Sequence, residues 1–152
     1  MELVESGDII IAQADAYTTT AVIGDLVTGM MKNKGGQAFV TDGLVRDHIG
    51  IEEVGLQVFT MGATPNSLAK TGPGTAGLPI ICGDFPVQSG DIALCDRDGV
   101  VIVPLARAAE VAEKLEILMV ADPAAVQAVK GGQTIPPAMT EFLNGPQTIY
   151  LD

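Results

Sequence analysis

Aromatic and basic residues are both scarce in this chain. Phenylalanine, tryptophan and tyrosine together supply 4% of its 152 residues, and tryptophan is absent. Eight lysine and arginine residues stand against nineteen acidic ones, which gives a formal net charge of −11. So negative a chain repels phosphate backbones and anionic lipids, and we expect neither broad nucleic-acid binding nor membrane-surface binding. The same charge permits cation binding.

Long apolar runs and closely spaced cysteines are missing as well. No segment approaches about eighteen uninterrupted apolar residues, and the first residues lack the basic and apolar regions of a signal peptide, so a cytoplasmic protein is expected. Cys82 and Cys95 lie in apolar, strand-like runs without a CxxC partner. We therefore expect two buried, reduced thiols rather than a disulfide or a zinc site.

The remaining composition predicts an α/β domain. Apolar residues make up 47% of the chain, enough for a substantial core, and a single domain is expected over residues 1–152. Residues 8–13 and 37–41 are continuous apolar runs of strand length. A helical pattern between them is carried by Val22, Leu26, Val27, Met30 and Met31, and a glycine pair follows it. A strand, a helix and a strand of this length form a βαβ unit.

Shorter patterns follow in the rest of the chain. Strands are expected at residues 57–61, 78–82, 91–95 and 100–103, with a hairpin turn at 96–99. Residues 106–120 have apolar side chains at helical spacing with Glu and Lys between them, which predicts a surface helix. Beyond residue 122 we expect one or two short helices and a terminal strand at 148–151. Residues 105–152 should thus form a largely helical C-terminal segment.

Two acidic motifs flank the strands of the βαβ unit. Gly24-Asp25 opens the predicted helix, and Arg46-Asp47 comes just past the second strand. Loops that leave the carboxyl ends of parallel strands share one rim of a sheet, so both motifs should meet there. A carboxylate can hold a hard divalent cation, and an arginine and the free amides of residues 26–28 can hold an anionic substrate. The motifs therefore predict a metal-assisted enzyme acting on keto acids.

A simpler interpretation of the same residues remains open at this stage. Asp25 could only cap its helix, and Arg46 could pair with Asp47 or Asp42 as a solvated surface bridge. Both arrangements are common and contribute little energy. Spacing alone does not decide between this interpretation and a functional site.

The two motifs belong to a longer series of blocks that resembles the 4-hydroxy-4-methyl-2-oxoglutarate aldolase family, which also contains the regulator of ribonuclease activity A. The likeness covers roughly residues 7–104, about two thirds of the chain. Its blocks in order are Gly24-Asp25-Leu26, Val40 to Asp47, Val58-Phe59, Gly62 to Pro65, Pro79 to Gly83, Val87 to Asp91 and Asp96 to Pro104. Several separate blocks in register make the resemblance specific.

What the resemblance implies is a layered α/β fold of the swivelling type, assembled as a homotrimer or homohexamer with active sites between subunits. The implied reaction is cleavage of 4-hydroxy-4-methyl-2-oxoglutarate into two pyruvates, with oxaloacetate decarboxylation as a second activity and Mg²⁺ or Mn²⁺ as cofactor. Family members carry several dozen residues ahead of the strand at 8–13. That N-terminal part of the family fold is expected to be missing here.

Roles also carry over from the family by position. Asp47 would be the metal-anchoring carboxylate, Arg46 the substrate-facing cation, and Asp25 the residue that holds metal-bound water. The amide cradle for the pyruvyl carboxylate would be formed by Gly24, Asp25, Leu26 and Val27. Both reactions leave the pyruvate enolate, so a divalent ion and Arg46 would stabilise negative charge that grows on one oxygen. Aldol cleavage also needs a base for the C4 hydroxyl proton, whereas decarboxylation does not.

Three further hypotheses compete with these assignments. An imine-forming lysine is disfavoured at Lys32 and Lys34, which lie far along the helix from Asp25, and Lys70 stays open. His48 beside Asp47 could be a base or a ligand, but neighbours in an extended loop point opposite ways, which favours a surface or interface histidine. The third hypothesis, from a different class, is a non-catalytic module that regulates a ribonuclease by docking on a partner protein.

Overall fold

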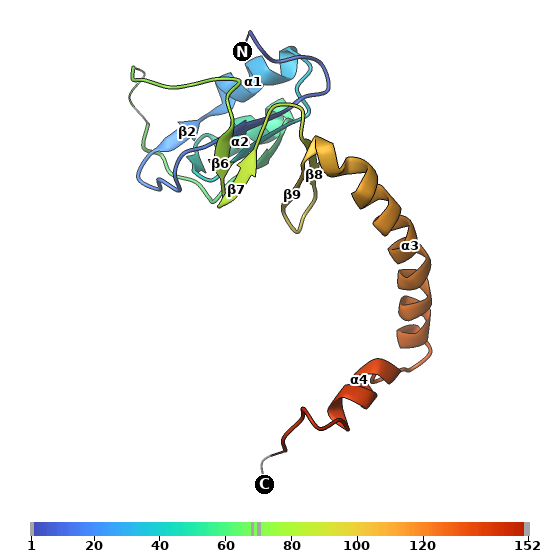
Figure 1. Ribbon diagram of the computed structural model, residues 1–152. Coiled ribbons are helices and arrows are strands. Elements are labelled where there is room, and N and C mark those ends of the chain that lie inside the picture. The colour runs from blue at the N-terminus through green and yellow to red at the C-terminus, as the bar shows by residue number, and fades with distance from the viewer. Residues whose placement is uncertain (1, 68, 70, 151–152) are drawn as a thin grey trace. The chain divides into compact units, whose positions relative to one another are not determined.

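The computed structural model describes residues 2–67, 69 and 71–150. The chain divides into two compact units, Met1–Ala108 and Ala109–Asp152, and each unit is described by itself. The first unit contains all the strands of the described residues and two of the α-helices (Figure 1). Its mixture of helices and small sheets confirms the predicted α/β class.

A parallel sheet of three strands forms the centre of the first unit. The strands are β1 (Ile9–Ala12), β3 (Ala38–Thr41) and β5 (Gln57–Phe59), in the spatial order β1-β3-β5. Every residue of the central strand β3 is buried, which explains why its sequence is continuously apolar up to Thr41 rather than alternating. The strands predicted at 8–13, 37–41 and 57–61 are confirmed.

A second, smaller parallel pair was not predicted. It consists of β2 (Ala21–Ile23) and β4 (Leu44–Val45). Val22, assigned above to the helical pattern, lies on β2, so that assignment is wrong. The reason is tertiary pairing: the amide of Ala21 donates to the carbonyl of Asn66 at 2.8 Å, and the segment pairs with β4 before the helix begins.

Two helices accompany these strands. The predicted helix is α1 (Asp25–Asn33), which ends before Gly35 at φ +90° as the glycine pair indicated. The second is α2 (His48–Val54), which is closed by Gly55 at φ +69°. The sequence interpretation of His48 as part of an extended loop is therefore wrong. Seven residues are too few for a periodic signal, and the helix depends on burying Ile51.

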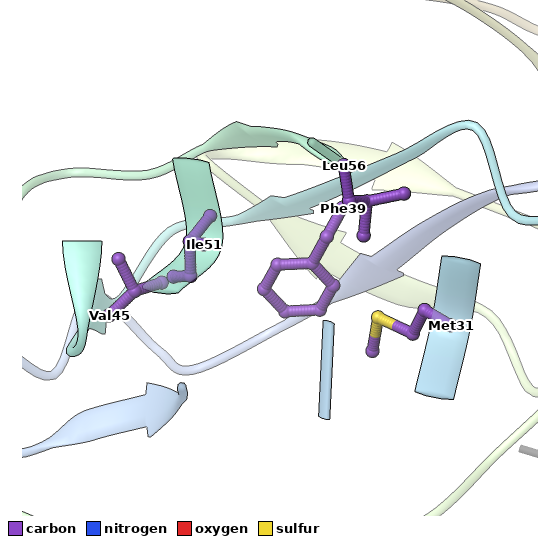
Figure 2. Close-up of a cluster of buried hydrophobic side chains, with 5 residues drawn as sticks. All are labelled: Met31, Phe39, Val45, Ile51 and Leu56. Carbon is purple, nitrogen blue, oxygen red and sulfur yellow. The ribbon is translucent and has the colours of Figure 1, made fainter. Parts of the chain in front are cut away.

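The main core lies where the sheet and both helices meet. Figure 2 shows its five buried side chains, which are Met31, Phe39, Val45, Ile51 and Leu56. They come from α1, β3, β4, α2 and the segment that enters β5. Phe39 and Val45 are fully buried, with 1% and 0% of their surface exposed to solvent. This cluster fixes α1 and α2 against the strands whose ends carry the two acidic motifs.

Two antiparallel hairpins complete the first unit. They are β6 (Ile80–Cys82) with β7 (Phe85–Val87), and β8 (Ile92–Cys95) with β9 (Val100–Val103). The hairpin predicted at residues 96–99 is confirmed, whereas β7 was not predicted. A short 3-10 turn, η1 (Leu105–Arg107), follows β9.

The second unit is helical. Its helices are α3 (Ala108–Lys130) and α4 (Pro137–Leu143). The helix predicted at 106–120 is present but continues through Pro123 to Lys130, so the expected end near residue 122 is wrong. Residues 148–150 form no strand, and the rest of the predicted terminal strand lies outside the described residues. Among the described residues, no helix combines the length and the apolarity that crossing a bilayer requires.

Candidate active site

Asp25 stands at the start of α1, directly after β2. Its Oδ1 accepts a hydrogen bond from the amide of Leu26 at 2.7 Å. Its own carbonyl accepts a hydrogen bond from Oγ1 of the fully buried Thr28 at 2.8 Å. Gly24, the residue before it, has extended backbone with φ −139° and provides no side-chain cap. These two hydrogen bonds therefore fix the position of Asp25 at the N-terminus of α1.

Arg46 and Asp47 follow β4 in the same way that Gly24 and Asp25 follow β2. The amide of Arg46 donates to the carbonyl of Ile23 at 3.0 Å, which ties the ends of the two strands together. Nη1 of Arg46 lies 3.5 Å from Oδ2 of Asp47, and the two side chains are 40% and 35% exposed. Asp47 has a left-handed backbone, with φ +61°, a conformation that Asp tolerates better than most residues. Both charged groups thus face solvent at one edge.

The structure brings the two motifs together, but at a different rim from the one predicted. The sequence predicted that both motifs meet at the carboxyl ends of the main-sheet strands. In the structure the motifs meet at the carboxyl ends of β2 and β4, the unpredicted parallel pair. The rule that parallel strands present their following loops on one edge still holds. Only the pair of strands was misidentified.

Gly24 shows how closely the motifs approach. A Cβ atom at this position would lie 2.3 Å from Oδ2 of Asp47 and 3.2 Å from Nε of Arg46. A side chain at position 24 would therefore displace the Asp47 carboxylate from its place against the backbone. The arrangement is a cradle of bare backbone with a carboxylate and a guanidinium packed on it.

The predicted amide cradle is partly engaged in internal contacts. The amide of Leu26 donates to Asp25 Oδ1, and the amide of Thr28 donates to the carbonyl of Gly24 at 3.2 Å. The Leu26 amide is therefore already occupied by the Asp25 carboxylate. The Arg46–Asp47 pair of the simpler interpretation is present, whereas Asp25 is the first residue of α1 and Gly24, not Asp25, is its N-cap. Asp42, however, is not the partner of Arg46.

Asp42 has a structural role that the sequence did not reveal. It is buried, and its carboxylate accepts hydrogen bonds from the amides of Ala14 at 2.5 Å and Ala16 at 3.2 Å. Asp15 and Ala16 have positive φ, so this carboxylate secures an unusual turn after β1. The only sequence signal was an Asp-Gly pair between two strands, which indicates a turn without naming its partner.

The side chains that could hold a cation are few. Within residues 2–67, 69 and 71–150, no three His, Cys, Asp or Glu side chains come together as a metal site. Asp47 offers a hard oxygen donor beside the Gly24 cradle. Since Mg²⁺ often binds through one or two protein carboxylates and keeps several waters, a single direct ligand suits its chemistry.

The alternative nucleophiles and bases are placed elsewhere. Nζ of Lys32 donates to the carbonyl of Val54 at the end of α2, so this lysine closes a helix. Lys70 lies outside the described residues. His48, the first residue of α2, is exposed and lines a cavity of about 320 Å³ together with Glu52 and Thr60. That cavity includes neither Asp25 nor Asp47.

Both cysteines are free thiols, as the spacing predicted, and both are half-buried. Burial raises the pKa of the Cys82 thiol, and the neighbouring Asp42 carboxylate raises that pKa further. Burial, followed by the Asp96 carboxylate, likewise raises the pKa of Cys95. Raised pKa values disfavour the thiolate, so neither thiol has the character of an activated nucleophile.

Comparison with known proteins identifies the family of this chain. A family model described as RraA-like, Aldolase/RraA, matches residues 1–102. The chain belongs to this RraA-like family. The match confirms the resemblance noted in the sequence and covers every residue of the two acidic motifs.

Individual relatives point to both activities associated with the family. The chain is 35% identical over 123 residues to a Halalkalibacterium halodurans protein provisionally named a 4-hydroxy-4-methyl-2-oxoglutarate aldolase, covering 81% of this chain. It spans 59% of the length of that curated relative. A solved Streptomyces coelicolor structure, RraAS2, is described as an unusual member of the RNase ES inhibitor RraA family. It is 28% identical with a TM-score of 0.75, covering 82% of this chain and 64% of that one.

A second solved structure supports the fold. An uncharacterized protein from Pseudomonas syringae pv. tomato is 27% identical with a TM-score of 0.79, covering 88% of this chain and 68% of that one. The RraA-like fold is therefore shown for this chain. Membership alone does not choose between catalysis and docking, because the relatives include a named aldolase and a named inhibitor.

Proposed function

We propose that this RraA-like protein is a divalent-metal-dependent aldolase that cleaves 4-hydroxy-4-methyl-2-oxoglutarate into two pyruvates and also decarboxylates oxaloacetate. The observation that carries the proposal is the packing of Arg46 and Asp47 against the bare backbone of Gly24. A potential metal ligand and an anion-binding cation thereby adjoin the start of a helix, which suits a small keto acid. The name of the aldolase relative supports the same reaction.

Asp47 is the residue that would hold Mg²⁺ or Mn²⁺. Its carboxylate is a hard oxygen donor, about one third exposed, and it lies against the bare backbone of Gly24. When bound, the ion would supply positive charge that stabilises the 2-keto oxygen of the substrate as it becomes an enolate.

Arg46 would bind the anionic end of the substrate. Its guanidinium presents several donors in one plane, which matches a carboxylate in two parallel hydrogen bonds. In this structure the guanidinium is 3.5 Å from Asp47 and 40% exposed, so it can turn to a ligand without a buried contact being broken. Its fixed charge would also favour the oxyanion.

Asp25 is proposed to relay the proton that aldol cleavage releases. The C3–C4 bond of the substrate breaks, its electron pair moves toward the 2-keto oxygen, and the C4 hydroxyl proton leaves through a water held by Asp25. Oxaloacetate loses CO₂ by breaking the corresponding bond, and no hydroxyl proton has to leave. We therefore expect Asp25→Asn to lower kcat for aldol cleavage at least as much as for decarboxylation. The opposite order in steady-state kinetics would remove Asp25 from the relay.

A non-catalytic ribonuclease regulator is the second candidate function. The description of the Streptomyces relative as an inhibitor-family member favours it. The Arg46 and Asp47 side chains beside Gly24 favour catalysis, because docking on a protein does not require a charged site of this kind. Pyruvate release from oxaloacetate discriminates the two. Turnover that EDTA abolishes and Mg²⁺ restores supports the aldolase, whereas a folded protein without turnover supports the regulator.

The assembly is part of the proposal. Leu26 and Ile49 flank Asp25 and Gly50 and are 72% and 75% exposed, so apolar side chains surround the site without being covered by their own chain. We propose a cytoplasmic homotrimer or homohexamer in which a second copy covers this surface and completes the site. Sedimentation velocity checks the mass of the particle.

A further inference from the structure

Gly50, in the first half of α2, lies against Asp25. A Cβ atom at position 50 would be 2.7 Å from Oδ2, 2.8 Å from Cβ and 3.1 Å from Cγ of Asp25. Those three atoms of Asp25 are the nearest ones to the absent side chain. Gly50 has ordinary helical backbone, so its conformation gives no reason for glycine. The reason is contact with a single neighbouring side chain.

The start of each helix therefore packs an aspartate against a glycine of the other segment. Asp47, immediately before α2, packs on Gly24 before α1, and Asp25 at the start of α1 packs on Gly50 in α2. Each acidic residue lies where the opposite helix has no side chain. Met31 of α1 and Ile51 of α2 belong to one buried cluster, which packs the two helices together.

We propose that Gly50 is the positioning residue for Asp25, fixing the carboxylate in the orientation that the proton relay of the proposed function requires. One oxygen, Oδ1, is held by the Leu26 amide at 2.7 Å. The other, Oδ2, rests over Gly50. A side chain at position 50 would meet Oδ2, Cγ and Cβ together, and Cβ does not move when the carboxylate rotates, so Asp25 as a whole is displaced and the proton acceptor with it. The catalytic part of this inference rests on the proposed function.

The steric part is tested without any activity measurement. Gly50→Ala is expected to lower Tm by about 5 °C in the wild-type background, because the methyl group meets Asp25. In an Asp25→Gly background all three contacting atoms are gone, and alanine is the better helix former, so the same substitution should leave Tm unchanged or raise it. Equal losses of Tm in both backgrounds would show that the cost of Gly50→Ala does not come from contact with Asp25.

Gly29→Ala is the matched control. It lies on α1 facing the same helix, but a Cβ there would be 3.7 Å from Cγ2 of Val54, an ordinary contact. Its effect on Tm should be the same whether residue 25 is Asp or Gly. The comparison separates a general effect of filling space between α1 and α2 from a specific effect on Asp25.

The catalytic part is tested by comparing two reactions of the same variant. Gly50→Ala should lower kcat for aldol cleavage by at least about tenfold with a much smaller effect on oxaloacetate decarboxylation, while Gly29→Ala changes neither. Adding Gly50→Ala to Asp25→Asn should lower kcat for aldol cleavage no further. An unchanged ratio of the two activities in Gly50→Ala overturns the positioning role even if the Tm result holds. A wild type without turnover refutes the proposed function and the positioning role together. The comparison of Tm values in the two backgrounds still decides whether the side chain of Asp25 packs on Gly50.

Discussion

The two units of the chain differ in whether their apolar side chains are buried. The first unit packs them into a core around Phe39 and Val45, and it carries both acidic motifs. The second unit is rich in Ile, Leu, Met and Val, yet none of the described residues of α3 and α4 is buried. The family match at residues 1–102 lies entirely within the first unit. The buried core and both acidic motifs therefore lie in the first unit.

The second unit leaves apolar side chains of α3 exposed. Ile117, Met119 and Val120 are adjacent or nearly adjacent in α3 and are 69%, 73% and 79% exposed. Consecutive positions point to different sides of a helix, so no single polar face remains there. The difference between the units can be tested residue by residue.

The largest expected effect is on the core of the first unit. Phe39→Ala should lower the free energy of unfolding by about 3–5 kcal/mol, because it removes a large buried ring and leaves a cavity. Leu118→Ala in α3 is the matched truncation, and at 53% exposure it should cost less than about 1 kcal/mol. Urea titrations followed by circular dichroism measure both. A loss for Leu118→Ala that equals the loss for Phe39→Ala would contradict the comparison and show that α3 is buried in solution.

The next effect concerns catalysis. Asp47→Asn should lower kcat/KM for oxaloacetate by about 10²–10³-fold, because the charge that would hold the cation is gone. Asparagine is chosen because it tolerates the left-handed backbone at position 47, where alanine would add strain. Stability should stay near the wild-type value, so a loss of activity cannot be attributed to unfolding.

Glu113→Gln provides the control for charge. It removes one negative charge from α3, as Asp47→Asn does from the first unit, and should leave turnover unchanged. Turnover that falls equally in both variants would mean that net charge, and not the Asp47 carboxylate, matters. Full activity of Asp47→Asn would exclude Asp47 as the metal anchor.

A smaller effect is expected within α3. Pro123 lies inside the helix and cannot donate a hydrogen bond to the carbonyl of Met119. Pro123→Ala should stabilise this helix by about 1–3 kcal/mol and increase the helical signal in far-UV circular dichroism. Pro137→Ala, at the first position of α4 where proline is well tolerated, should change little. A decrease in helical signal for Pro123→Ala would show that the proline is required for the native arrangement.

The sequence predicted those elements whose burial leaves a continuous local pattern. β1 is apolar throughout, β3 is apolar up to Thr41 and is buried at every position, so a run of strand length was sufficient. β2, β4 and α2 were missed because each is short and is stabilised by distant residues. Val45, for example, donates to the carbonyl of Gly62 and accepts from the amide of Thr64. No window along the chain contains that information.

The site was predictable in its residues more than in its geometry. Gly24, Arg46 and Asp47 do lie together, and whether they perform catalysis remains a prediction. Their meeting at β2 and β4, rather than at the main sheet, follows from pairing that spacing does not encode. Gly50 was overlooked because its partner, Asp25, lies on another helix. A glycine within an apolar helical segment is the one signal that could have indicated a close approach.

The smallest predicted effect is on thiol reactivity. Cys82 and Cys95 both belong to the first unit, so their alkylation reports its packing. Because burial and a nearby carboxylate raise each pKa, the thiolate fraction at neutral pH is lower than for a free cysteine, and labelling by iodoacetamide should be slow and should accelerate as pH rises above about 8.5. Asp96→Asn removes one charge beside Cys95 and should increase its labelling rate by a small factor while leaving Cys82 unchanged. Peptide mass spectrometry measures each site separately. Equal acceleration of both thiols would mean that the substitution loosens the whole unit, and the assignment of Asp96 as a local cause would then fail.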